Sequence, residues 1–305
     1  MINKKILITG ASGFLGNHIL KYNQRYNIIN KSNLFLLTSK KIPYHNCILH
    51  KNYSYNKSEL NSIGKIDTLI HLASFCPKIR ADMNNINENI KTITTSQYLL
   101  NHIPNIPKKI IYISTISVYG NKLINYPKPI NEQTDILPDF LYGFSKAMSE
   151  EILKEFCKNL DIKLYILRIG VTYGINDDLR NGTIPTIIKS ILSNKNIKVY
   201  NEGKELKHFI HTDDISRIIL NTATTNITDN MINLVDNKAI KIIDLINIIE
   251  RFCNKKANIK YLDRIPCNDT LFDNRLMIKN FGELKIPLEI GLREVCEYYK
   301  HTNIS

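Results

Sequence analysis

The sequence of 305 residues has no apolar run that approaches 18 residues, so no segment is long enough to cross a bilayer as a helix. Its six cysteines form no C-x-x-C pair and lie in no zinc-like spacing with histidine, which argues against a metal site or a redox dithiol. The apolar run before Gly10 is too short for a signal peptide. We therefore expect a cytoplasmic protein with reduced thiols, no bound metal and no membrane partner.

Blocks of basic residues are also absent, although the net charge is +13. The lysines and arginines are scattered and are not interleaved with aromatic residues, so nucleic acid is not an expected partner. A positive field of this kind would instead help to attract a doubly anionic small substrate.

No internal repeat or low-complexity linker divides the chain. Short apolar runs predict strands buried on both faces of a parallel sheet, at Lys5–Thr9, Leu34–Thr38, Asp67–Ser74, Lys109–Ser114 and Lys163–Gly170. Stretches of helical length lie between them, at 15–26, 85–102 and 145–160. This alternation predicts βαβ units and a doubly wound, Rossmann-type α/β fold.

The pattern changes after Gly174. We expect a helix at 184–192, a hairpin-like pair of strands within 199–215 and an amphipathic helix at 242–253. The chain is accordingly predicted to divide into two parts. Residues 1–174 and 206–236 would form the Rossmann domain, while 175–205 and 237–305 would form a smaller mixed lobe, with substrate between them.

The most specific local pattern is Gly10-Ala11-Ser12-Gly13-Phe14-Leu15-Gly16, directly after the first predicted strand. Glycines spaced by three allow a tight turn and a close approach of the backbone to a pyrophosphate, and the following helix directs its first amides at the anion. A glycine-rich turn can simply close a sheet, but a strand before it and a helix after it favour dinucleotide binding.

A second pattern is Tyr142-Gly143-Phe144-Ser145-Lys146. Residues four apart share one face of a helix, so the ammonium of Lys146 can lie near the phenol of Tyr142. A neighbouring cation stabilises the phenolate and moves its pKa from about 10 towards the working pH. Alone, this spacing fits equally well a surface helix with a packed tyrosine and a solvated lysine.

Several motifs occur together in a recognisable order: GASGFLG, HLAS at 71–74, Asn89 in a long helix, STISVYG at 114–120, YGFSK, LRIGVTYG at 167–174 and ELKHFIHTDD at 205–214. With them the chain resembles, over nearly its full length, the extended short-chain dehydrogenases/reductases of the nucleotide-sugar epimerase/dehydratase group. The resemblance implies that Tyr142 is the catalytic acid/base, that Lys146 lowers its pKa and holds the nicotinamide ribose, and that Thr115 hydrogen-bonds the reacting sugar oxygen.

The resemblance also assigns binding residues. The implied cofactor contacts are Gly10, Ser12, Gly13, Phe14, Leu15, Gly16, Ser39, Lys40, Leu72, Ala73, Ser74, Asn89, Tyr142, Lys146, Ile169 and Val171. The implied substrate contacts are Ser74, Thr115, Thr183, Lys207 and Arg264. None of the histidines is assigned a catalytic role, and His71 is expected to be a packed core residue.

Departures from the family pattern narrow the activity. Dehydratases of the family carry Asp-Glu after the threonine, where this chain has Ile116 and Ser117. Neither side chain can transfer the required protons at pH 7, which argues against a 4,6-dehydratase. Ser117 is expected to be a turn hydroxyl. Val171 stands where many epimerases have a substrate-binding asparagine, and Lys207 stands in place of a diphosphate-binding arginine, losing its bidentate fork.

The end of the second predicted strand bears on the cofactor. NAD enzymes of this kind place an acid there for the adenosine ribose, whereas this chain reads Thr38-Ser39-Lys40-Lys41. Ser39 and Lys40 could meet a 2′-phosphate, so NADP is expected over NAD, with a solvated lysine pair as the alternative.

The expected activity is the NADPH-dependent reduction of the C4 keto group of a nucleotide-activated 4-keto-6-deoxyhexose. The alternatives are an NAD-dependent nucleotide-sugar 4-epimerase and, on the same fold, a non-catalytic dinucleotide-sensing protein. By the same resemblance, a homodimer is expected to pair through the helices at 85–102 and 145–160.

Overall fold

The computed structural model describes residues 4–44, 46–50, 57–77, 80–103, 105–120, 129–177, 182–236, 238–262 and 271–302. Its centre is a seven-stranded sheet in which every neighbouring pair is parallel. In spatial order its strands are β11 (Met231–Leu234), β6 (Lys163–Ile169), β5 (Lys109–Thr115), β4 (Thr68–His71), β1 (Ile6–Thr9), β2 (Leu34–Thr38) and β3 (Cys47–Leu49). The predicted doubly wound, Rossmann-type class is confirmed.

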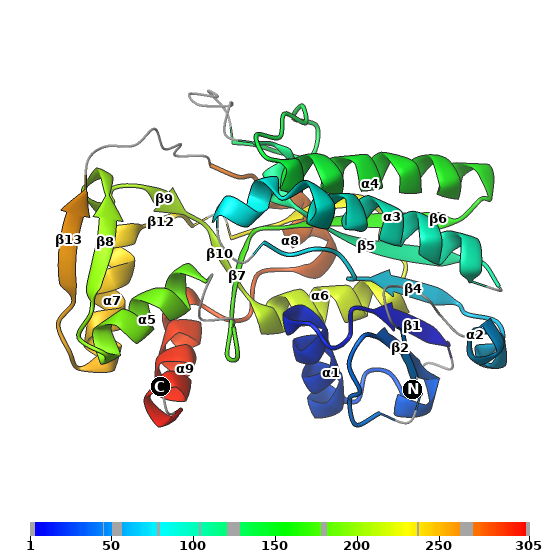
Figure 1. The fold of residues 1–305 in the computed structure, drawn as a ribbon, viewed down its shortest axis with the longest axis horizontal. Helices are drawn as coiled ribbons and strands as arrows, with labels where there is room; N and C mark the ends of the chain where they lie inside the picture. Colours follow the sequence, from blue (N-terminus) through cyan, green and yellow to red (C-terminus); the bar gives the residue numbers. More distant parts are fainter. Residues whose placement is uncertain are drawn as a thin grey trace.

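Helices cover both faces of this sheet (Figure 1). One face carries α1 (Phe14–Tyr26), α6 (Thr212–Thr224) and α8 (Arg275–Phe281), and the other carries α2 (Lys57–Ile63), α3 (Ile86–His102) and α4 (Leu141–Asn159). Side chains alternate between the two layers, as strand geometry requires. In β1, Ile6 and Ile8 pack with α1 and α6, while Leu7 packs with α2 and α3. The strands are largely apolar because both faces are buried.

A second hydrophobic core lies beside the sheet, in the part drawn at the left of Figure 1. It joins α5 (Thr183–Leu192), α7 (Ile242–Cys253) and α9 (Leu288–His301) with three two-stranded sheets. These pair β10 (Phe209–His211) with β7 (Val171–Tyr173), β12 (Ile240–Lys241) with β9 (Leu206–Lys207), and β13 (Asn258–Leu262) with β8 (Asn196–Tyr200). The division of the chain into two domains at the predicted boundaries stays a prediction.

The predicted hairpin within 199–215 is wrong. The segment instead contributes β8, β9 and β10 to three different sheets, and only the β9–β12 pair is antiparallel. The reason lies between β8 and β9. Asn201, Glu202 and Gly203 all have positive φ, at 51, 55 and 70°, so the chain turns away after Tyr200, and β9 and β10 find partners distant in sequence.

Helix α4 begins earlier than expected, at Leu141 and not at Ser145. Phe140 has extended φ/ψ angles as its N-cap, two residues after Pro138, where a helix cannot readily continue upstream. The earlier start places Tyr142 in the first turn of the helix. None of the helices within the described ranges is long and apolar enough to cross a membrane.

Candidate active site

The glycine turn lies at the carboxyl ends of β1, β2 and β4. Gly10 has a φ of +69°, and its amide donates to the carbonyl of Leu37 at 3.1 Å. A Cβ at Gly10 would lie 2.9 Å from the amide nitrogen of Ala73, and one at Gly16 would lie 2.5 Å from the carbonyl oxygen of Gly10. Both positions therefore require glycine for close backbone packing.

The first turn of α1 is suited to an anion. Its N-cap is Gly13, and no side chain caps the helix. The first amides of a helix have no partner within it, and the helix dipole favours negative charge there. The turn therefore fits the pyrophosphate of a dinucleotide, and Gly10, Ser12, Gly13, Phe14, Leu15 and Gly16 would hold it.

His71 is a packed core residue, as expected, and lies under this turn. Its Nδ1 is 2.8 Å from the Thr9 hydroxyl and its Nε2 is 2.9 Å from the Ser96 hydroxyl. The Thr9 hydroxyl also accepts the amide of Ala73 at 3.1 Å. Burial, and then the charge of Lys146, lower the pKa of His71 to about 3. A neutral imidazole thus fastens the end of β1 to β4 and α3.

The end of β2 forms a small turn where the adenosine ribose would be expected. The Thr38 hydroxyl donates to the carbonyl of Lys40 at 2.8 Å and accepts the amide of Lys40 at 3.1 Å. Ser39 and Lys40 within this turn, and Lys41 after it, are exposed. The turn therefore presents a hydroxyl and positive charge to solvent.

Thr115 ends β5 and begins the short 3-10 helix η3 (Ile116–Val118). As the N-cap of η3 its hydroxyl accepts the amide of Ser117 at 3.2 Å, and it lies 3.2 Å from the Ser117 hydroxyl. Ser117 is thus the turn hydroxyl that was expected. The Thr115 hydroxyl also hydrogen-bonds the phenol of Tyr142.

Close packing of α4 against η3 brings these two hydroxyls together. The helix can approach because residue 143 is glycine: a Cβ there would lie 2.5 Å from the carbonyl oxygen of Ser117 and 2.8 Å from Cβ of Pro138. Gly143 therefore sets the position of its neighbour Tyr142 relative to Thr115.

The pKa of Tyr142 is raised well above its ordinary value. Burial is the main cause and the nearby Cys76 adds to it, whereas the hydrogen bond with Thr115 acts in the opposite direction. The expected lowering of this pKa by Lys146 is therefore wrong for the chain as it stands. At neutral pH Tyr142 keeps its proton and can donate it.

Lys146 lies one helical turn after Tyr142 and points at the sheet. Its ammonium donates to the carbonyl of Ile113 at 2.6 Å and to the hydroxyl of Ser74 at 3.1 Å. Burial lowers its pKa to about 8, although the neighbouring Cys76 and Glu150 raise it. The ammonium is thus anchored to β5 and to the loop after β4, not to the phenol.

Asn89 fastens the two helices that flank this site. Its amide nitrogen donates to the carbonyl of Asn85 at 2.8 Å within the N-terminal part of α3, and its oxygen accepts the hydroxyl of Ser145 on α4 at 3.4 Å. Ile169 ends β6, and Val171 begins β7 just after it.

The structure brings together the glycine turn, Ser74, Thr115, Tyr142 and Lys146 at the carboxyl ends of β1, β4 and β5, where open α/β sheets bind their ligands. Thr183 begins α5 and Lys207 lies in β9, where it pairs with the carboxylate of Glu205. Among the described residues, no hydrogen bond or ion pair joins Thr183 or Lys207 to Ser74, Thr115, Tyr142 or Lys146. Arg264 lies outside the described residues.

Cys76 and Glu150 act on the site that contains Tyr142 and Lys146, but they were not predicted from the sequence. Cys76 comes two residues after Ser74 in HLASFC, and Glu150 comes four residues after Lys146 in the same helix. The helical spacing of Glu150 was the available signal.

Within the described ranges no three His, Cys, Asp or Glu side chains could hold a metal ion together.

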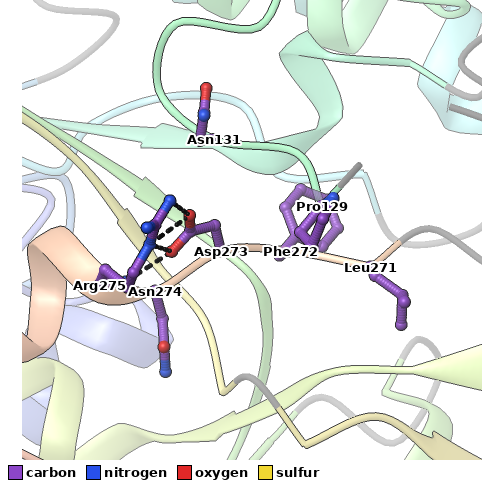
Figure 2. Close-up of a pocket in the computed structure, with 7 residues that line it drawn as sticks. All are labelled: Pro129, Asn131, Leu271, Phe272, Asp273, Asn274 and Arg275. Atoms are coloured by element: carbon purple, nitrogen blue, oxygen red, sulfur yellow. Dashed lines mark hydrogen bonds and ion pairs between the residues drawn. The ribbon is translucent and has the colours of Figure 1, made fainter. Parts of the chain in front are cut away.

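A pocket of about 450 Å³ is lined by Pro129, Asn131 and residues 271–275 (Figure 2). Ile130 and Phe272 form a parallel bridge beside it. Among the described lining residues, the charged ones are Asp273 and Arg275, which pair with each other at 2.6 Å. None of the lining residues is a predicted site residue.

A model of the NAD dependent epimerase/dehydratase family matches residues 6–234. The chain belongs to this family. The resemblance read from its motifs is thereby confirmed, as is the expectation of an NAD(P)-dependent enzyme of the short-chain dehydrogenase/reductase type.

Individual relatives differ in activity. The chain is 29% identical over 237 residues to a dTDP-D-glucose 4,6-dehydratase of Dictyostelium discoideum, covering 70% of this chain and 54% of that protein. It is 26% identical over 282 residues to a dTDP-4-dehydro-6-deoxyglucose reductase of Escherichia coli, covering 86% of each.

Among solved structures, the chain is similar to the UDP-N-acetylglucosamine 4-epimerase from Methanobrevibacter ruminantium M1 in complex with UDP-N-acetylmuramic acid. The TM-score is 0.84 and the identity 24%, covering 98% of this chain and 99% of that one. Similarity at this level shows the shared fold.

Proposed function

We propose that this family member reduces the C4 keto group of a nucleotide-activated 4-keto-6-deoxyhexose with NADPH. The observation that carries the proposal is the phenol of Tyr142, hydrogen-bonded to Thr115, beside Ile116 and Ser117 where family dehydratases have two acids. Such a site can donate one proton to one oxygen, but it lacks the additional acid and base that elimination of water needs.

A bound NADPH would supply the hydride. Thr115 and Tyr142 would hydrogen-bond the keto oxygen, and Tyr142 would give its proton to the oxygen as negative charge develops there. Lys146 would hold the nicotinamide ribose from its anchored position. The reduction consumes one hydride and one proton and produces the alcohol.

The raised pKa of Tyr142 supports this direction of reaction. A reductase needs the phenol as an acid, whereas a 4-epimerase must first use it as a base to oxidise a sugar hydroxyl. The Escherichia coli reductase, covered over 86% of its length, supports the same substrate class.

NADP in preference to NAD is supported by the end of β2. The exposed Ser39 and Lys40 lie in the turn that Thr38 closes, and the segment 38–41 holds none of the acids that NAD enzymes of this kind place there. A hydroxyl and an ammonium can bind a 2′-phosphate, while an acid at this position would repel it.

A homodimer through α3 and α4 is supported by an apolar patch on their outer faces. The patch is made of Ile86 and Ile90 on α3 and Phe144 and Met148 on α4, each 51–62% exposed. In Figure 1 these helices lie side by side along one face of the sheet. Exposed apolar side chains gathered on two neighbouring helices are typical of an interface.

The test is NADPH oxidation, followed by near-ultraviolet absorbance, with CDP-, dTDP-, GDP- and UDP-linked 4-keto-6-deoxyhexoses. Turnover that is lost in Tyr142→Phe would support the reductase and identify the nucleotide. No oxidation with any of them, together with release of NAD on denaturation, would reject it in favour of a 4-epimerase, the activity of the structural neighbour from Methanobrevibacter ruminantium.

A further inference from the structure

The ammonium of Lys146 has an aromatic neighbour in addition to its two hydrogen-bond acceptors. Its Nζ lies over the ring of Tyr112, 4.7 Å from the centroid. The lysine is 3% exposed and the tyrosine 0%. A cation this close to a desolvated ring face interacts favourably with the negative charge of that face.

The geometry of β5 places the ring there. Successive side chains of a strand point to opposite faces, and Tyr112 points to the layer of α3 and α4, whereas Ile113 points to the layer of α1 and α6. Tyr112 therefore contributes its ring beneath α4, and Ile113 contributes only its carbonyl. Both contacts come from adjacent residues of one rigid strand, just before Thr115.

We propose that Tyr112 is a positioning residue for the cofactor: its ring face, with the Ile113 carbonyl and the Ser74 hydroxyl, holds the charged ammonium of Lys146 at the end of β5. This inference rests on the proposed function, in which Lys146 binds the nicotinamide ribose.

The ring offsets the effect of desolvation on the charged form of Lys146. Burial favours the neutral amine, and a ring face stabilises only the charged form. The other ionisable groups near the ammonium are Tyr142 and Glu150 on α4, with Cys76 and His71 at β4 and the loop after it. Cys76 and Glu150 favour the charged form, and His71 stays neutral. Weakening the ring contact should therefore lower the pKa of Lys146.

A core-filling role for the ring is separable because the adjacent strand holds a matched contact. Tyr165 of β6 is 4% exposed, and Lys109 Nζ lies 5.4 Å from its ring centroid. Lys109 donates to the carbonyls of Thr222 and Thr225 and belongs to no predicted site. The same changes at Tyr165 alter a buried tyrosine under a buried lysine without touching the catalytic group.

The experiment replaces Tyr112 first by phenylalanine and then by site-specific difluoro- and pentafluorophenylalanine. This series keeps the ring shape, so that folding is preserved, while it removes negative charge from the ring face. Two quantities are measured for each protein. One is the pKa of Lys146 without cofactor, by competitive acetic anhydride labelling and mass spectrometry, and the other is the affinity for NADPH at pH 8, by fluorescence.

We expect the pKa of Lys146 and the NADPH affinity to fall in step along the series, with a total loss of affinity of about 2- to 30-fold. The equivalent series at Tyr165 should leave both unchanged. An unchanged pKa of Lys146 across the series at Tyr112 would overturn the ring contact, whatever the enzyme's reaction. A falling pKa with constant NADPH affinity would overturn the positioning role, because it would show that Lys146 does not hold the cofactor.

Discussion

The carboxylate of Glu150 and the guanidinium of Arg168 form a two-point ion pair that solvent does not reach. Arg168 Nε lies 3.0 Å from Oε1 and Nη2 lies 2.6 Å from Oε2, and neither side chain is more than 1% exposed. Ser114 donates to the same carboxylate at 2.5 Å, and Arg168 donates to the phenol of Tyr119 at 2.8 Å. The pair therefore fastens α4 to β5 and β6 directly below Thr115.

Replacing Glu150 by glutamine should lower the free energy of unfolding by about 3–5 kcal/mol, because it leaves a buried guanidinium without its counter-charge. Glu151→Gln is the matched control: it affects an exposed pair with Lys154 on the same helix and should cost less than about 1 kcal/mol. Urea denaturation at pH 7 measures both. Equal losses in the two variants would contradict a structural role of the buried pair.

Substitutions of the second and third glycines of the turn, Gly13 and Gly16, should have different effects on the protein. A Cβ at Gly16 would lie 2.5–2.7 Å from backbone atoms of Gly10 and Ala11, so Gly16→Ala should lower the melting temperature. A Cβ at Gly13 would meet only the Gly10 carbonyl oxygen, at 3.2 Å, and Gly13→Ala should mainly obstruct the approach of a pyrophosphate.

Differential scanning fluorimetry with and without NADPH separates these effects. Gly13→Ala is expected to keep most of its melting temperature and to lose most of the rise on adding cofactor. A Gly13→Ala protein stabilised by NADPH as strongly as the unmodified chain would argue against pyrophosphate binding at this turn.

The glycine turn and the pair Tyr142 and Lys146 could be predicted because their geometry is local. A turn and one helical repeat fix the relative positions of residues three or four apart, whatever the rest of the chain does. Asn89 on α3 and Ser74 after β4 could be assigned only through the family resemblance. Their contacts with Ser145 and Lys146 join segments 56 and 72 residues apart.

Other features depend on pairings that no local pattern specifies. Val199 pairs with Tyr261 in the β8–β13 sheet, a choice of partner that the alternation of apolar residues leaves open. Arg168 interrupts an otherwise apolar strand, and this was the available signal of a buried ion pair, but its partner is on another element. The raised pKa of Tyr142 follows from burial, which the helical spacing could not reveal.

The apolar patch on α3 and α4 predicts the effect of a charge in the proposed dimer interface. Phe144→Glu should convert a dimer to a monomer, because a carboxylate buried without a partner is strongly unfavourable. Size-exclusion chromatography with light scattering measures the mass. Ile290→Glu on α9 is the control, since Ile290 is 53% exposed, close to the 54% of Phe144, and lies outside the patch. A monomeric unmodified chain, or a dimeric Phe144→Glu variant, would reject this interface.

Two buried lysines allow the pH dependence of stability and of cofactor affinity to be assigned to individual residues. Burial lowers the pKa of both Lys146 and Lys109 to about 8. In the unfolded chain each would keep its proton to a pH near 10.5, so between pH 8 and 9.5 the unfolded state binds more protons and stability from these groups rises with pH. Cofactor affinity should change in the opposite direction, because the ammonium of Lys146 loses its charge over the same range.

We expect the dissociation constant of NADPH to rise up to about fivefold between pH 8 and 9, as the protonated fraction of a group with a pKa near 8 falls. Lys146→Met should weaken binding at pH 7 and remove this dependence. Lys109→Met should keep the dependence, since Lys109 Nζ donates to carbonyls at the end of α6 and belongs to no predicted site. Fluorescence titrations of NADPH across this pH range measure all three proteins. A pH dependence that disappears in Lys109→Met but persists in Lys146→Met would assign it to Lys109 and reject the proposed role of Lys146.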